Sequence, residues 1–207
     1  SSPDSILSAQ QVREACCAHY SSPTREHTVQ PGMVYISLPT ECGTLYTRAQ
    51  LEALHSCCRE LGLLLYIDGA RLGYGLTSPA NDLTLADIAS LCDLFYIGGT
   101  KCGALLGEAL VIVNDALKAD FRYTIKQRGG MLAKGWLLGL AFDALFTDGL
   151  YCDICRQANE YALSIRSTLE QKGIPLGYDS HTNQQFPILT ARQLARLQPK
   201  YVWEPWQ

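Results

Sequence analysis

The sequence has no long uninterrupted hydrophobic segment and no cluster of positive charge. Its apolar runs at 61–67 and 109–113 are far shorter than the roughly 20 residues that a membrane-spanning helix needs. Its 17 lysines and arginines are interspersed with 20 acidic residues, which gives a formal net charge of −3. Proteins that bind a phosphate backbone carry clustered basic residues. We therefore expect neither membrane insertion nor nucleic-acid binding.

The N-terminus lacks the basic segment and following apolar stretch of a secretory signal peptide. The nine cysteines are an odd number, and the pairs at 16–17 and 57–58 are adjacent, so their side chains point in different directions on a helix. The CxxC of Cys152 and Cys155 has neither a second such pair nor a suitable histidine, and we predict no metal site. We expect reduced thiols, mostly in the core, and a cytoplasmic protein.

The sequence does contain start and stop signals for several helices. Ser8 and Thr47 are each followed three residues later by glutamine, the pattern of a capping box. They predict helices from Ser8 to about residue 20 and from Thr47 to Gly62, because glycine commonly ends a helix. A short helix is predicted over 84–91, and helical patterns dominate 114–171.

Short apolar runs predict four strands, at 33–36, 63–67, 94–97 and 109–113. They show no polar alternation, which is typical of parallel strands buried on both faces. Alternation of these strands with helices predicts the α/β class, as a three-layer α/β/α sandwich with a mainly parallel sheet. Beyond residue 173 the segments are short and punctuated by proline and glycine.

Two residues lie at the sheet edge where α/β proteins commonly have their ligand-binding sites. Asp68 ends a predicted strand, and Lys101 follows the next one, so both belong to the edge where α/β proteins bind ligands. A partly desolvated lysine can lose its proton and form an imine, and an aspartate stabilises a protonated ring nitrogen. Pyridoxal phosphate requires this pair. Spacing alone leaves two alternatives open: Asp68 as the cap of a turn, and Lys101 as a solvated loop residue.

Other phosphate-binding motifs do not fit. The pattern GxxxxGK[ST] requires glycine before the lysine and serine or threonine after it, but here Thr100 precedes Lys101 and Cys102 follows. No GxGxxG opens a helix after a strand.

The segments Tyr-Ile-Asp-Gly-Ala-Arg-Leu at 66–72 and Tyr-Ile-Gly-Gly-Thr-Lys-Cys-Gly at 96–103 closely resemble the β-eliminating lyase/threonine aldolase family. These are pyridoxal-phosphate enzymes of the aspartate aminotransferase fold. The segments at 39–46 and 127–131 are similar to that family as well. The resemblance runs from about residue 8 to at least residue 190, and it extends to the low-specificity L-threonine aldolases.

The resemblance implies a role for each matching position. Lys101 would form the Schiff base with pyridoxal phosphate, and Asp68 would hold the ring nitrogen. Arg71 would lie near the cofactor's phenolic oxygen or the substrate carboxylate. Thr100 would flank the Schiff base.

Further positions would border the same pocket or reach another subunit. Thr40 or Glu41 would line the pocket, and Arg128 or Lys134 would approach a phosphate across a subunit interface. The four histidines match no site position of the family, and we expect them at the surface.

The resemblance further implies a pyridoxal-phosphate-dependent lyase with an amino-acid substrate, working as a homodimer or homotetramer. Aldol cleavage of L-threonine or allo-threonine to glycine and acetaldehyde is the favoured reaction. The alternatives are β-elimination, transamination, or a fragment without catalytic activity.

It also predicts the domain organisation. Residues 1–172 would form the cofactor-binding large domain without its N-terminal part, and 173–207 would begin a small α+β domain. The short apolar segments at 174–178 and 187–189 predict strands of this second unit. Two tryptophans near the end, at 203 and 206, have no following element to cover them. We therefore expect a piece of a larger chain.

Overall fold

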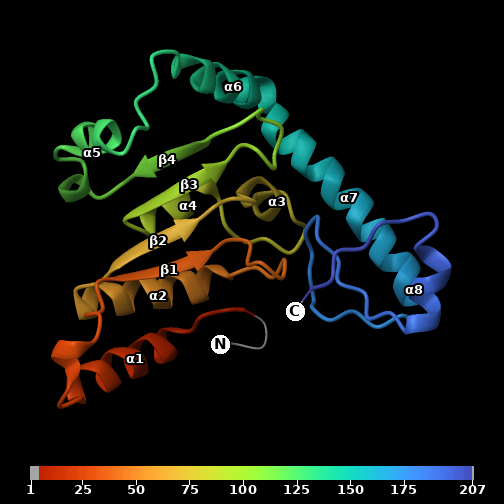
Figure 1. The fold of residues 1–207 in the computed structure, drawn as a ribbon, viewed down its shortest axis with the longest axis horizontal. Coiled ribbons are helices and arrows are strands. Elements are labelled where there is room, and N and C mark those ends of the chain that lie inside the picture. Colours follow the sequence, from red (N-terminus) through yellow and green to blue (C-terminus); the bar gives the residue numbers. More distant parts are fainter. Residues whose placement is uncertain (1–4, 207) are drawn as a thin grey trace.

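The fold is built on a four-stranded sheet with the strand order β1-β2-β3-β4 (Figure 1). The computed structural model describes residues 5–206. The strands are β1 (Met33–Ser37), β2 (Leu64–Asp68), β3 (Leu94–Gly98) and β4 (Glu108–Ile112). The α-helices are α1 (Ala9–Ser21), α2 (Arg48–Leu61), α3 (Leu72–Leu76), α4 (Leu85–Ser90), α5 (Phe121–Gln127), α6 (Trp136–Phe146), α7 (Leu150–Gln171) and α8 (Ala191–Leu197). Short 3-10 turns are η1 (Arg25–His27), η2 (Asp115–Leu117) and η3 (Thr147–Gly149).

The sheet is mostly parallel, which confirms the predicted α/β class. Strand β2 pairs in parallel with β1 and with β3, whereas β4 pairs antiparallel with β3. A parallel crossover needs a dozen or more residues, and the connection at 99–107 is shorter. The chain therefore turns back, and β4 closes the sheet as the second strand of a hairpin.

The expectation that the strands are buried on both faces is wrong for one face. The face that is buried carries Val34, Ile36, Leu65, Ile67, Phe95 and Ile97. The opposite face carries Tyr35, Tyr66 and Tyr96 and is half-exposed, with Tyr35 showing 50% of its surface. The apolar runs concealed this asymmetry because a tyrosine ring counts as apolar, although its hydroxyl seeks a polar partner.

The predicted helix signals are confirmed. Ser8 and Thr47 both form complete capping boxes with the glutamine three residues on, and Gly62 ends α2 in the left-handed conformation (φ 66°). Helix α2 contributes Leu51 and Leu54 to the core beneath the sheet, and α1 lies on the far side of α2 (Figure 1). All nine cysteines are free thiols and seven are buried, as the sequence predicted.

The strands expected at 174–178 and 187–189 are not formed. Leu176 and Pro187 make a single antiparallel bridge, flanked by hydrogen bonds from Gly177 N–H to the Phe186 carbonyl and from Ile188 N–H to the Pro175 carbonyl. Proline has no amide hydrogen, so neither Pro175 nor Pro187 can donate to a longer ladder.

The last residues lie back on this segment. Trp206, expected to lack cover, has its ring centroid 5.4 Å from that of Phe186, although 46% of its surface stays exposed. The proposed division at residue 172/173 stays a prediction.

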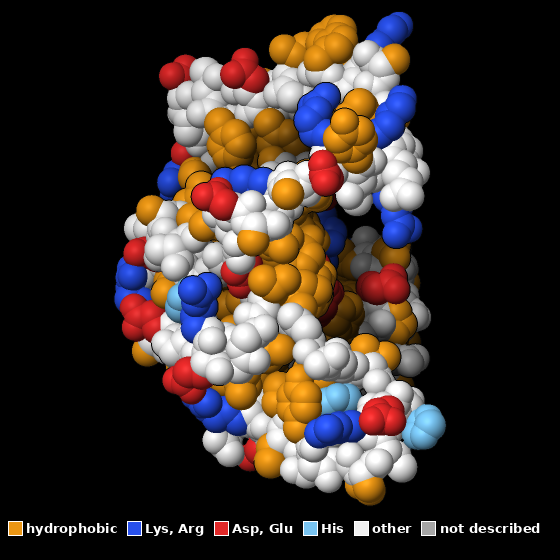
Figure 2. All heavy atoms as spheres, turned by 90° about the vertical axis from the view of Figure 1, so that its left-hand side faces the viewer, with side chains coloured by type: hydrophobic (Ala, Val, Ile, Leu, Met, Phe, Trp, Pro, Cys, Tyr) orange, Lys and Arg blue, Asp and Glu red, His pale blue; other side chains and the backbone are white. Residues whose placement is uncertain are grey.

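Helix α6 is unusual because it is apolar around its circumference and yet mostly exposed. Among its residues only Leu145 is buried. Trp136, Leu137 and Leu140 each show more than half of their surface. Figure 2 shows apolar side chains at the top of the molecule, where α5 and α6 lie, and over the middle of the same view. Within residues 5–206, no helix has both the length and the apolar character needed to cross a bilayer.

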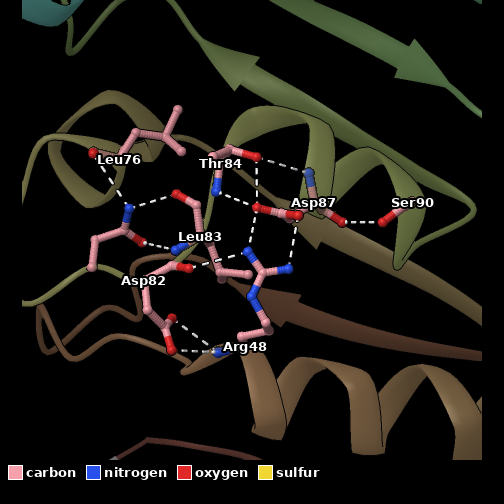
Figure 3. Close-up of polar contacts among 8 residues, drawn as sticks. Arg48, Leu76, Asp82, Leu83, Thr84, Asp87 and Ser90 are labelled. Atoms are coloured by element: carbon pink, nitrogen blue, oxygen red, sulfur yellow. Dashed lines mark hydrogen bonds and ion pairs between the residues drawn. The ribbon is translucent and has the colours of Figure 1, made fainter.

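An ion-pair network joins the starts of α2 and α4 (Figure 3). The Arg48 guanidinium donates to both carboxylate oxygens of Asp87, at 2.7 and 2.6 Å. The same carboxylate accepts from the backbone and hydroxyl of Thr84, at 2.8 and 2.6 Å, and caps α4. Asp82 accepts from the Arg48 amide. These bonds fix the loop between α3 and α4 to the helix that covers the sheet.

We expect Asp87→Asn to lower the thermal unfolding midpoint at pH 7 by about 2–4 °C. The bonds from Arg48, then those from Thr84, hold the pKa of the Asp87 carboxyl well below its usual range. A lowered folded-state pKa stabilises the fold above the ordinary carboxyl pKa of about 4 and loses that effect as the pH falls. The difference between variant and wild type should therefore shrink as the pH approaches 3. Asp115→Asn, which breaks an exposed ion pair with Lys118, is the control. If Asp87→Asn and Asp115→Asn have the same unfolding midpoint, the prediction is contradicted.

Candidate active site

Asp68 is the last residue of β2, and three donors hold its carboxylate. The Ala70 amide donates to Oδ1 at 2.9 Å, and the Tyr96 hydroxyl donates to the same oxygen. The Tyr35 hydroxyl donates to Oδ2. Asp68 therefore also caps the following turn, through its bond from the Ala70 amide. This bond occupies one of the four lone pairs of the carboxylate, so it does not prevent Asp68 from binding a ligand.

The carboxylate is kept charged although it is partly buried. Burial acts to raise the pKa of Asp68, but the hydroxyls of Tyr35 and Tyr96, the Ala70 amide and the nearby charge of Lys101 outweigh it. The pKa of Asp68 consequently lies below its ordinary value. A stable negative charge at this strand end is suited to a partner that carries a proton on nitrogen.

Lys101 lies in the tight turn that follows β3, and neighbouring residues fix its backbone. Glu108 accepts from the Gly99 amide at 2.7 Å and from the Thr100 hydroxyl at 2.8 Å. The Tyr74 hydroxyl donates to the Lys101 carbonyl. The Lys101 ammonium group makes no hydrogen bond or ion pair within residues 5–206. The loop is thus held at both ends while its amine is left available.

Two glycines bring the Asp68 and Lys101 segments together. The Gly98 amide donates to the Gly69 carbonyl at 2.8 Å, across the ends of β2 and β3. A Cβ at Gly69 would lie far inside van der Waals contact with the Tyr96 carbonyl oxygen, and a Cβ at Gly98 would overlap the Ala70 carbonyl. Both motif glycines are needed for close approach of the backbones.

The other predicted site residues fall into two groups. The Arg71 guanidinium, which is mostly buried, lies 3.7 Å from the exposed Glu41 carboxylate. The buried Thr40 hydroxyl is 2.6 Å from the Thr44 hydroxyl and accepts from the Thr44 amide at 3.2 Å. Thr40 therefore stabilises the turn that presents Glu41, and Glu41 is the one of the two that reaches Arg71.

Neither the Arg128 nor the Lys134 side chain makes a hydrogen bond or an ion pair with the residues above. Arg128 directly follows α5, which lies at the opposite end of the sheet from the carboxyl ends of β1, β2 and β3 (Figure 1). Both residues are exposed. A role across a subunit interface stays a prediction. None of the four histidines is buried, and the described residues contain no group of three metal-binding side chains.

Sequence reasoning missed Tyr35 and Tyr96, as well as the Glu108 and Tyr74 contacts that fix the lysine loop. A signal for the first two was available. Tyr35, Tyr66 and Tyr96 all fall on the strand face that also carries Asp68, at positions that alternate with the buried residues. Glu108 and Tyr74 had no such signal, because their partners depend on the hairpin and on α3.

The residues present fit pyridoxal phosphate. Oδ2 of Asp68 accepts one hydrogen bond from the described residues and keeps a lone pair for a ring N–H. The Lys101 side chain is exposed and makes no hydrogen bond or ion pair within residues 5–206, which also agrees with the alternative of a solvated loop residue. As a primary amine beside this strand end, it could bond an aldehyde carbon. Arg71 offers a partly buried cation for an oxyanion of the ring or of a carboxylate.

Comparison with known proteins gives the same family. The profile of the beta-eliminating lyase family matches residues 7–192. A low-specificity L-threonine aldolase of Pseudomonas sp. (strain NCIMB 10558) is 32% identical over 179 residues, which are 84% of this chain and 51% of that protein. Its counterpart in Pseudomonas aeruginosa is 31% identical with the same coverage.

A solved structure agrees over the whole chain. The threonine aldolase of Leishmania major superposes with a TM-score of 0.92 at 47% identity, covering 100% of this chain and 60% of that one. This chain spans about half the length of the curated relatives it matches. Members of this family depend on pyridoxal phosphate. The fold, the Asp68–Lys101 arrangement and these matches agree, and the chain belongs to the beta-eliminating lyase family of pyridoxal-phosphate-dependent lyases.

Proposed function

We propose that this chain carries the lysine and aspartate of an aldolase that cleaves L-threonine or allo-threonine to glycine and acetaldehyde. The observation that carries the proposal is the position of Asp68 at the end of β2 and of Lys101 in the turn after the adjacent parallel strand β3. A hydrogen bond from Gly98 to Gly69 holds the two strand ends together. The 47% identity to a threonine aldolase over the whole chain favours aldol cleavage over β-elimination and transamination.

Each residue of the site then has a definite task. Bound pyridoxal phosphate supplies an electron sink for the bond that breaks at the substrate α-carbon. Asp68 keeps a proton on the ring nitrogen, which makes that sink effective. Lys101 would hold the cofactor through its amine. Arg71 orients an oxyanion of the ring or the substrate, with Glu41 beside it.

Thr100 and Thr40 act on the position of these groups. Thr100 keeps the lysine turn attached to Glu108, and Thr40 shapes the turn that carries Glu41. A homodimer or homotetramer stays a prediction, supported by the exposed apolar surface of α6, since helices apolar on all sides are normally buried.

The test is to mix the purified chain with pyridoxal phosphate, reduce with borohydride and map the modified peptide by mass spectrometry. Stoichiometric modification of Lys101, out of six lysines, is the expected result. Label spread over the lysines, or none in a chain that circular dichroism shows to be folded, would mean that this chain holds no cofactor site.

The reaction is then identified from its products. Glycine with acetaldehyde from L-threonine or L-allo-threonine indicates aldol cleavage. Pyruvate with ammonia from L-serine would indicate β-elimination instead, and a new amino acid formed from an added keto acid would indicate transamination. A labelled chain with no turnover would support the interpretation as a non-catalytic fragment.

A further inference from the structure

Three tyrosines stand side by side across the half-exposed face of the sheet, and the outer two converge on Asp68. Tyr35 comes from β1, Tyr66 from β2 and Tyr96 from β3. The ring centroid of Tyr66 lies 5.2 Å from that of Tyr35 and 6.2 Å from that of Tyr96, both in edge-to-face geometry. The hydroxyls of Tyr35 and Tyr96 donate to the two different oxygens of Asp68.

The two oxygens of Asp68 are unequally occupied. Oδ1 accepts from the Ala70 amide and from Tyr96, which uses both of its lone pairs. Oδ2 accepts from Tyr35 alone among the described residues, and one lone pair is left. Oδ2 is therefore the atom that can accept a hydrogen bond from a ligand without displacing a protein donor.

The donors are neutral, and this matters for the charge that a ligand meets. No lysine or arginine within residues 5–206 forms an ion pair with Asp68. Hydroxyl donors stabilise the carboxylate but leave its net charge at −1, so the charge remains available to a cationic ring. A cation in the same place would cancel it.

We propose that Tyr35 and Tyr96 are positioning residues for Asp68, which turn its Oδ2 towards the cofactor's ring nitrogen and keep the carboxylate ionised. This inference rests on the proposed function. Tyr96 fixes Oδ1, so that the carboxylate cannot rotate, and Tyr35 shares Oδ2 with the ring N–H.

The first measurement needs no cofactor. The pKa of Asp68 in the cofactor-free chain, followed by 13C NMR, is expected to rise in Tyr35→Phe and in Tyr96→Phe, because each change leaves a partly buried carboxylate with one donor fewer. Tyr66→Phe is the matched control. It lies on the same face, loses the same atom, and its hydroxyl has no hydrogen-bond partner within residues 5–206.

The second measurement isolates the ring nitrogen. 4′-Deoxypyridoxine phosphate has no aldehyde, so its affinity reports the ring contacts without the bond to Lys101. Its dissociation constant should rise about 3- to 10-fold in Tyr35→Phe and Tyr96→Phe, as for loss of a hydrogen bond to a charged group near solvent. With an analogue whose ring nitrogen is replaced by C–H, the same variants should bind like the wild type.

Each outcome decides the question. Equal loss of affinity for both analogues would show a general structural role and would overturn the inference. So would Tyr35→Phe and Tyr96→Phe variants that match Tyr66→Phe in both measurements. If pyridoxal phosphate labels Lys101 in the wild type but the tyrosine variants give these negative results, the proposed function stands and only the inference fails. If the folded wild type binds neither compound, the proposed function fails and the inference falls with it.

Discussion

Lys101→Ala is expected to abolish covalent retention of pyridoxal phosphate and to lower amino-acid turnover by about 10³-fold or more. In the proposed function the Lys101 amine bonds the aldehyde carbon, while Asp68, at the end of the neighbouring strand β2, holds the ring nitrogen. Its backbone is fixed by Tyr74 and its loop by Glu108, so the substitution removes the amine without removing the supports of the turn. The measurements are borohydride trapping and the rate of glycine formation.

Two further variants separate the possible causes of such a loss. Lys118→Ala removes an exposed lysine that pairs with Asp115, and it should behave like the wild type in both measurements. Lys101→Arg keeps a positive charge near Asp68 but removes the primary amine, and it should fail like Lys101→Ala. Covalent label that persists in Lys101→Ala at full stoichiometry would show that another lysine forms the Schiff base.

Gly69→Ala is expected to destabilise the fold by about 3 kcal/mol or more, which is at the upper end for overpacking. The added Cβ would overlap the Tyr96 carbonyl oxygen, and backbone cannot move aside as a flexible side chain does. The strand ends that carry Asp68 and Lys101 would be forced apart, so cofactor binding should fall along with stability. Urea unfolding and a thermal scan would measure the first effect, and trapping at Lys101 the second.

Gly139→Ala is the control, because it adds the same methyl group at a position where no other atom is close. Gly139 lies inside the exposed helix α6, and a Cβ there would meet nothing within 4 Å. Alanine should stabilise this helix by about 0.5–1 kcal/mol, because it has the higher helix propensity. A Gly69→Ala protein as stable as Gly139→Ala would mean that the close approach of the strand ends is not required.

Local signals in the sequence were sufficient for most of the elements. A capping box depends on residues three apart in the chain, so Ser8 and Thr47 marked their helices without any tertiary information. The order of apolar runs and helices determined the α/β class in the same way. Asp68 and Lys101 were found because chain order alone places the ends of successive parallel strands at one sheet edge.

Tertiary structure decided what surrounds those two residues. The partners of Asp68 are 33 and 28 residues away in sequence, on strands to either side. Strand alternation places three tyrosines on the face of Asp68, but it does not tell which of their hydroxyls reach the carboxylate. The direction of β4 depended on a connection too short for a crossover, and it brought Glu108 to the lysine turn. The half-exposed face of the sheet followed from packing, because the same apolar run suits burial on one face or on two. Sequence by itself thus determined which residues we propose to carry the chemistry, because chain order places strand ends together. The folded chain decided which groups surround them, because those partners come from distant strands and loops.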